Sequence, residues 1–212
     1  MYNLIRKEVI VLRWYFLFNA GYALVFGVFL QSSFSPLMIS MLPPIMMMMF
    51  AANMELRNKA MMFIGTLPIS RKQIVSAKYV TVFFYYLIGL ILMAVIHAAN
   101  EFAYSVENTM AMSAEITILM ILLSFSFTML YAAFYYPIQY WLGVKYSNII
   151  SFVSIFFMVI VLSTVANIIE KFSDYLIANE FVVIGIPALS LLLFYGSYRL
   201  SLIIFTRQDM AG

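Results

Sequence analysis

The chain has 212 residues, of which 65% are hydrophobic and only 10% are charged, and its mean hydropathy is +1.00. Soluble globular domains are about 45–50% apolar and about 25% charged, so the composition excludes that class. A net charge of +3 gives no indication of a nucleic-acid partner, and a chain with no cysteine and one histidine is not expected to hold a catalytic, metal or cofactor site.

Residues 2–14 are predicted to form an amphipathic helix at the membrane surface. Apolar side chains recur at helical spacing, and polar and basic side chains take the opposite face: Tyr2, Ile5, Val9 and Leu12 against Asn3, Arg6, Lys7 and Arg13. An ordinary basic flank would explain the charges equally well, but it would not explain the apolar stripe. A cleaved signal peptide over residues 1–35 is a further alternative, although the apolar run is longer than is usual for one.

Five long stretches without charged residues follow, and they begin after Arg13, Lys78, Glu115, Lys145 and Glu180. Because a helix needs about 20 largely apolar residues to cross a bilayer, four of these stretches fit one span each. The first is long enough for two spans, separated by polar residues and a proline at 31–36. We therefore predict an all-α, polytopic membrane protein, one domain over residues 1–212, with six transmembrane helices at about 15–31, 36–53, 79–98, 114–136, 148–168 and 181–204.

The distribution of basic residues predicts the orientation of these helices. With the N-terminus inside the cell, every Lys and Arg except Lys171 falls in a predicted inner segment. Cytoplasmic segments of membrane proteins carry such an excess. We expect both termini to be cytoplasmic and the chain to lie in the cell membrane.

The second predicted span contains Pro43 and Pro44, followed by four methionines at 46–49. Prolines remove backbone donors and bend or break a helix. The bend could be a hinge near a substrate path, or a static kink whose freed carbonyls are met by neighbouring helices. The methionines could offer an adaptable surface to apolar cargo, or they could simply contact lipid and other helices.

Residues 54–78 lie between the second and third predicted spans and carry five of the twelve basic residues. Gly65 is placed to stop a helix, and Pro68 favours an extended backbone at the residue before it. Ser70 and Gln73 then form an S-x-x-Q capping box that starts a new helix. The pattern predicts a helix, a tight break and a second helix on the cytosolic side, with apolar side chains that need a partner. A basic loop whose hydrophobic residues rest on lipid is the alternative.

Two absences narrow the mechanism. The sequence has no G-x-x-x-x-G-K phosphate-binding loop, so any ATP must be hydrolysed by another chain. No charged residue lies deep within a predicted span, which disfavours an ion-coupled carrier. Polar side chains inside the spans are instead expected to hydrogen-bond between helices: Asn19, Thr81, Ser124, Ser126, Thr128, Ser154, Ser163, Thr164, Ser190 and Ser197.

The stretch Thr66-Leu67-Pro68-Ile69-Ser70-Arg71 followed by Lys78-Tyr79 resembles the small membrane subunits of type-2 ABC exporters. Weaker matches are Gly143-Val144-Lys145 and the C-terminal Tyr198-Arg199-Leu200-Ser201 leading to Thr206-Arg207-Gln208-Asp209. The chain departs from the family pattern in carrying Thr66 where a serine is expected, which is a conservative change.

This resemblance implies that residues 54–78 form a coupling helix that rests in a groove of a separate, dimeric cytosolic ATPase. ATP and Mg would bind to that ATPase, this chain would need no cofactor, and a second permease, identical or different, would pair with it. The implied contact residues are Glu55, Arg57, Lys59, Met61, Met62, Phe63, Thr66, Leu67, Pro68, Ser70, Arg71 and Lys72, with Gly143, Val144 and Lys145 as a second inner contact.

The resemblance also implies a cargo of amphipathic peptides, of the phenol-soluble-modulin or bacteriocin kind, or of other hydrophobic compounds. We therefore predict the permease subunit of an ATP-driven exporter that moves such compounds out of the cell. The alternative is a non-transporting membrane assembly or sensor protein that recruits a cytosolic partner through the loop at 54–78.

Overall fold

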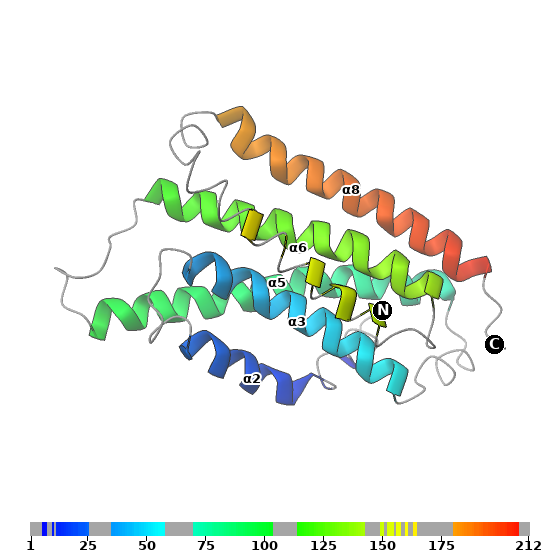
Figure 1. Ribbon diagram of the computed structural model, residues 1–212, viewed down its shortest axis with the longest axis horizontal. Helices are drawn as coiled ribbons and strands as arrows, with labels where there is room; N and C mark the ends of the chain where they lie inside the picture. Colours follow the sequence, from blue (N-terminus) through cyan, green and yellow to red (C-terminus); the bar gives the residue numbers. More distant parts are fainter. Residues whose placement is uncertain are drawn as a thin grey trace.

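The structure is a computed structural model in which long helices lie side by side in one bundle (Figure 1). It describes residues 6–7, 10, 12–25, 35–57, 70–103, 114–142, 149–150, 152–154, 156–157, 160, 163–164 and 180–207. The helices are α2 (Arg13–Leu24), α3 (Ser35–Arg57), α5 (Arg71–Ala103), α6 (Ala114–Leu142) and α8 (Glu180–Arg207). Helices α2 and α5 run opposite to α3, α6 and α8. These residues include no strand, so the predicted all-α fold is confirmed for them.

Four helices in the described ranges are long and apolar enough to cross a membrane, and they cover Leu37–Glu55, Arg71–Ala99, Thr117–Leu142 and Ile184–Arg207. They match the second, third, fourth and sixth predicted spans. The 12-residue helix α2 covers part of the first predicted span, whose residues 26–31 lie outside the described residues. Within the fifth, at 148–168, every described residue is helical. Six crossings and their orientation remain a prediction.

The helices extend further than the predicted spans. Helix α3 continues to Arg57, and α5 begins at Arg71 rather than near 79, so both helices enter the predicted coupling segment from its two ends. Helix α6 continues through Pro137 to Leu142. The predicted limits were set by apolar character alone, whereas backbone hydrogen bonds hold a helix together beyond the apolar run.

Helix α3 runs through Pro43 and Pro44 without interruption. Because Pro44 has no N–H, the carbonyl of Ser40 loses its usual partner within the helix. Gly89 of α5 packs at this point, and a Cβ on Gly89 would lie 3.0 Å from Pro44 Cδ and closer still to the Ser40 carbonyl oxygen. The missing side chain at position 89 therefore allows α5 to approach the backbone of α3 closely, as small residues do between membrane helices.

In α6, Pro137 likewise deprives the carbonyl of Ala133 of its partner within the helix. The hydroxyl of Ser197 on α8 donates a hydrogen bond to this carbonyl, at 2.6 Å. Tyr79 of α5 completes the contact, because its hydroxyl lies 2.7 Å from Ser197 Oγ and 2.8 Å from Ser201 Oγ. Since the hydrogen of Ser197 is used by Ala133, Tyr79 donates to Ser197 and accepts from Ser201. This hydrogen-bond chain joins α5, α6 and α8.

Replacing Ser197 by Ala is expected to lower the free energy of unfolding by about 1–2 kcal/mol, because the carbonyl of Ala133 would be left without a donor in an apolar interior. In a Pro137→Ala background the same substitution should cost less, since residue 137 would regain an N–H for that carbonyl. Ser190→Ala is the matched control, because this buried hydroxyl bonds only to its own helix, at Pro187 O. Denaturant unfolding in detergent micelles measures all four variants, and equal losses for Ser197 in both backgrounds would contradict this role.

The expectation that hydroxyls bond between helices is confirmed for two of the predicted residues. Ser197 bonds to α6, and Ser124 Oγ lies 3.2 Å from the hydroxyl of Tyr86 on α5. It is wrong for six others, whose side chains donate to carbonyls three or four residues earlier in the chain: Asn19, Thr81, Ser126, Thr128, Thr164 and Ser190. A helix always offers a carbonyl three or four residues back, and a short hydroxyl side chain takes that nearer acceptor.

Candidate functional site

The predicted coupling residues that the structure describes lie at the end of the bundle where α3 stops and α5 starts. Five of them lie in the described residues: Glu55, Arg57, Ser70, Arg71 and Lys72. The others lie outside the described residues: Lys59, Met61, Met62, Phe63, Thr66, Leu67, Pro68, Gly143, Val144 and Lys145. The geometry of the site is therefore that of the two helix ends flanking residues 58–69.

The start of α5 is fixed by the predicted capping box. The N–H of Gln73 donates to Ser70 Oγ at 3.3 Å, and the N–H of Ser70 donates to Gln73 Oε1 at 3.3 Å. These reciprocal bonds satisfy two backbone donors that a helix start leaves free. The prediction that Ser70 and Gln73 begin a helix is confirmed, and this helix begins at Arg71.

Arg71 joins the start of α5 to the end of α8. Its Nη1 donates to the carbonyl of Thr206 at 3.0 Å and to that of Phe205 at 3.3 Å. These carbonyls belong to the last turn of α8, where the helix dipole favours a cation. Arg71 is half-buried, while the neighbouring Ser70 and Lys72 are exposed. The guanidinium of Arg71 therefore holds the chain's own helix, and Ser70 and Lys72 face outward.

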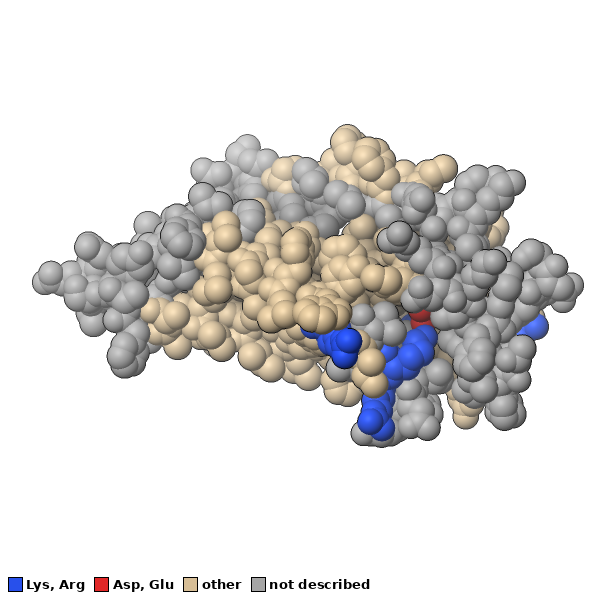
Figure 2. All heavy atoms as spheres, turned by 90° about the horizontal axis from the view of Figure 1, so that it is seen from below, with Lys and Arg blue, Asp and Glu red and all other residues tan. Residues whose placement is uncertain are grey.

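Glu55 is buried, with a side chain that is 4% exposed, and it binds two lysines from distant parts of the chain. Its Oε1 accepts from Lys7 Nζ at 2.5 Å, and its Oε2 accepts from Lys78 Nζ. The Lys78 side chain is 6% exposed and that of Lys7 is 31% exposed. In Figure 2, which views the molecule from below, a small acidic area in red lies directly beside basic side chains in blue. We call Lys7, Glu55 and Lys78 the ion cluster. Both carboxylate oxygens of Glu55 thus bind lysines of the same chain.

Aromatic packing fixes the same end of α5. The ring of Tyr79 lies 5.0 Å from that of Phe194, 5.2 Å from that of Tyr136 and 5.3 Å from that of Tyr198. One turn earlier, Ser76 Oγ lies 2.8 Å from the hydroxyl of Tyr198. The first three turns of α5 thus contact α3, α6 and α8. Sequence reasoning singled out Lys78 and Tyr79 as motif residues but could not identify the side chains that they contact.

Comparison with known proteins identifies the family of the chain. The sequence profile described as ABC-2 family transporter protein matches residues 3–206. The chain belongs to the ABC-2 transporter family. Searches of curated proteins and of solved structures find no match.

Membership of the ABC-2 family tests several predictions made from the sequence. The chain is a multi-pass membrane protein and an ABC transporter permease, a family that lacks the ATPase domain, and ABC-2 permeases generally pair with an ATPase subunit. The predicted resemblance is confirmed at the level of the ABC-2 family. The alternative of a non-transporting assembly or sensor protein is disfavoured, because the chain is the membrane component of a transporter.

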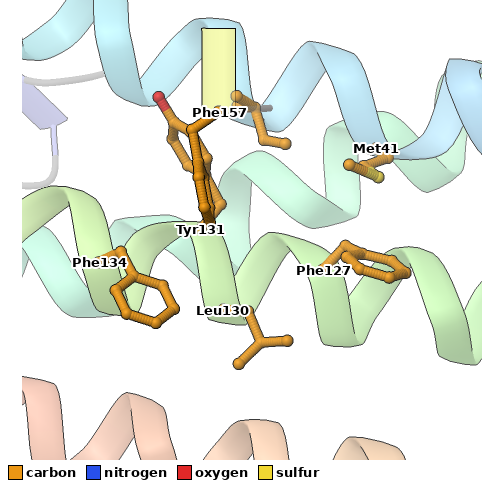
Figure 3. Close-up of a pocket in the computed structure, with 7 residues that line it drawn as sticks. Met41, Phe127, Leu130, Tyr131, Phe134 and Phe157 are labelled. Atoms are coloured by element: carbon orange, nitrogen blue, oxygen red, sulfur yellow. The ribbon is translucent and has the colours of Figure 1, made fainter. Parts of the chain in front are cut away.

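The ABC-2 permease has a small apolar hollow of about 80 Å³ beside α3 and α6 (Figure 3). Side chains from α3, α6 and the segment between α6 and α8 line it: Met41, Ile45, Phe127, Leu130, Tyr131, Phe134 and Phe157. The nearby methionines of α3 pack inside the bundle, because Met47 and Met48 are fully buried and Met49 is buried. Of the alternatives for the methionines at 46–49, contact with other helices fits these three.

Metal-ligating side chains are not gathered in the described part of the permease, where no group of three or more His, Cys, Asp or Glu residues could hold an ion. The described part of the candidate site flanks residues 58–69. It consists of two helix ends, ion pairs and caps that hold them, and outward-facing residues beside residues 58–69.

Proposed function

We propose that this ABC-2 permease is the membrane subunit of an ATP-driven exporter that moves amphipathic peptides or other hydrophobic compounds out of the cell. A separate, dimeric cytosolic ATPase hydrolyses the ATP, and a second permease completes the membrane part. The observation that carries the proposal is the anchoring of both helix ends beside residues 58–69. The capping box and Arg71 hold the start of α5, and Glu55 holds the end of α3.

In this proposal residues 54–72 form the coupling segment that contacts the ATPase. A segment between two anchored helices passes a displacement to those helices, whereas a slack loop would absorb it. Arg57, Lys59 and Lys72 supply complementary charge, and apolar side chains fill the groove of the ATPase: Met61, Met62, Phe63 and Leu67. Thr66, Pro68 and Ser70 shape the break between the two helices, and Gly143, Val144 and Lys145 form the second contact.

The structure adds a distinction between the coupling residues. Glu55 and Arg71 have partners within the chain, so their contribution to coupling is to hold the helix ends rather than to touch the ATPase. Lys72 is exposed on the first turn of α5 and is the described cation best placed for the partner.

The proposed cargo class is supported by the apolar character of the bundle. Aromatic and methionine side chains line the hollow between α3 and α6 and leave almost no polar surface there. Large apolar side chains are also exposed along α2, α5 and α8, for example Trp14, Ile91 and Leu192, where lipid and the second permease would cover them. The apolar part of a compound can pass next to such surfaces at little cost, because it has no hydrogen bonds to water that it would lose.

The double variant Phe63→Ala with Lys72→Glu tests the coupling contact. We expect stimulation of the ATPase to fall about tenfold, equivalent to about 1.4 kcal/mol, because an apolar anchor and a complementary charge are lost together. The measurement is ATP hydrolysis by the complex reconstituted in vesicles, with permease content determined by immunoblot.

The matched control is Lys171→Glu with Phe172→Ala, which makes the same two kinds of change in the segment predicted to lie outside the cell. This control should leave stimulation unchanged. Equal losses in both double variants, or full stimulation with Phe63→Ala and Lys72→Glu, would contradict the assignment of the coupling segment.

A further inference from the structure

The ion cluster joins three segments that are far apart in the chain. Lys7 belongs to residues 2–14, which we call the N-terminal segment. Glu55 belongs to the last turns of α3, and Lys78 to the third turn of α5. The carboxylate of Glu55 uses one oxygen for each lysine. Glu55 thus forms an ion pair with each of the two lysines, and the N-terminal segment is held to α5 through it.

The two arms of the cluster differ in exposure. The Lys78 ammonium is nearly as buried as the carboxylate, so separating this pair would leave a charge in a medium of low dielectric constant. Lys7 is 31% exposed, so its ammonium can exchange the carboxylate for water at a much lower cost. The Lys78 arm is therefore the permanent one, and the Lys7 arm is the one that can open.

The N-terminal segment has the composition of an element at the membrane surface. Arg6, Arg13 and Trp14 are exposed, and the guanidinium of Arg13 lies 5.6 Å from the centre of the Trp14 ring. Basic and tryptophan side chains of this kind are typical of the headgroup layer. Lys7 ties this surface element to the helix ends that flank residues 58–69.

We propose that Glu55 is a positioning residue that binds the N-terminal segment to the two flanking helices, so that the N-terminal segment moves with the coupling segment and supports its transmission. This inference rests on the proposed coupling function. The coupling free energy comes from contacts that differ between two states of the coupling segment. The ion pair between Lys7 and Glu55 is formed in one state and weakened in the other. Opening the Lys7 arm by mutation should uncouple the ATPase while leaving the pair between α3 and α5 intact.

Charge inversion separates the two arms. Glu55→Lys with Lys78→Glu keeps an opposite-charge pair between α3 and α5, but it places an ammonium against Lys7. Adding Lys7→Glu restores both arms with inverted signs. Lys7→Gln, which leaves the buried pair untouched, is the milder second variant in case the double inversion does not accumulate in the membrane.

Two readouts are needed. The first is the mobility of a nitroxide label on Arg6→Cys, which is specific because the chain contains no cysteine. The second is stimulation of the ATPase in the reconstituted complex. We expect the double inversion and Lys7→Gln to mobilise the label and lower stimulation by about fivefold or more, and the triple inversion to restore both.

An immobile label in Lys7→Gln and in the double inversion would overturn the inference, because the N-terminal segment would then be held by other contacts. A mobile label with normal stimulation would also overturn it, because release of the segment would have no effect on coupling. Failure of the unsubstituted complex to stimulate the ATPase would contradict the proposed function itself. The label measurement, made on the permease alone, distinguishes these failures.

Discussion

Glu55→Gln is expected to lower the free energy of unfolding by about 3–5 kcal/mol, the range found when one partner of a buried ion pair is removed. The carboxylate is 4% exposed and accepts from two ammonium groups. Its loss would leave Lys78, which is 6% exposed, without its opposite charge and close to Lys7. A neutral amide can accept a hydrogen bond from an ammonium group but cannot balance its charge.

Removing the second charge should recover much of this loss. In Glu55→Gln with Lys78→Met, no buried charge remains, and replacing a buried pair by apolar or neutral groups is often close to neutral. Lys72→Met is the matched control on the same helix, because Lys72 is exposed, and it should change stability by less than about 0.5 kcal/mol. Denaturant unfolding in detergent micelles measures the whole set. Additive losses in the double variant would show that Glu55 and Lys78 do not stabilise one another.

Gly89→Ala is expected to be the second most damaging substitution, with a loss of about 1–3 kcal/mol. The added Cβ would meet the backbone oxygen of Ser40 and the ring of Pro44, which are parts of α3 that cannot rotate away. The two helices must then separate, and the buried contacts around them loosen.

The opposite sign is expected at other glycines. Gly21 and Gly196 also lie inside helices, but an added Cβ there meets nothing within 4 Å. Because alanine favours a helix over glycine by about 1 kcal/mol, Gly21→Ala and Gly196→Ala should be neutral or stabilising. Thermal unfolding in micelles compares the three variants. A loss at Gly89 no larger than at Gly196 would contradict the close approach of α3 and α5.

Local signals in the sequence predicted the local parts of the fold. Long uncharged stretches located α3, α5, α6 and α8, because a bilayer requires about 20 apolar residues in each span. The capping box was predicted to the residue, since Ser70 and Gln73 are three positions apart and need no other part of the chain. The limit of the third span was less well predicted, because apolar character alone placed its start near 79, whereas the helix that begins at the capping box continues into the span without a break.

Contacts between distant residues could not be predicted in this way. The charges of Lys7, Glu55 and Lys78 were visible, but Lys7 lies 48 positions and Lys78 lies 23 positions from Glu55, and no periodicity links them. The family resemblance implied that Arg71 contacts the ATPase. Its acceptors are backbone carbonyls of α8, which are present in every helix and give no signal in a sequence.

The prolines also separate a local feature, which the sequence predicts, from a contact between helices, which it does not. The sequence predicts that Pro43 and Pro44 free carbonyls in the second span, because a proline lacks an N–H, and the structure shows Pro137 inside α6 as well. The sequence does not say how the neighbouring helix responds. The structure gives two different answers, a glycine that allows close packing at Ser40 and a serine hydroxyl that donates to Ala133.

The central claim is that a separate ATPase binds the segment between α3 and α5. Copurification tests this claim most directly. The tagged permease is extracted from native membranes in mild detergent, and bound proteins are identified by mass spectrometry. We predict an ATPase with a phosphate-binding loop on the unsubstituted chain and on Lys171→Glu with Phe172→Ala, and its loss from Phe63→Ala with Lys72→Glu. Recovery of no such ATPase, or of equal amounts with both double variants, would contradict the account.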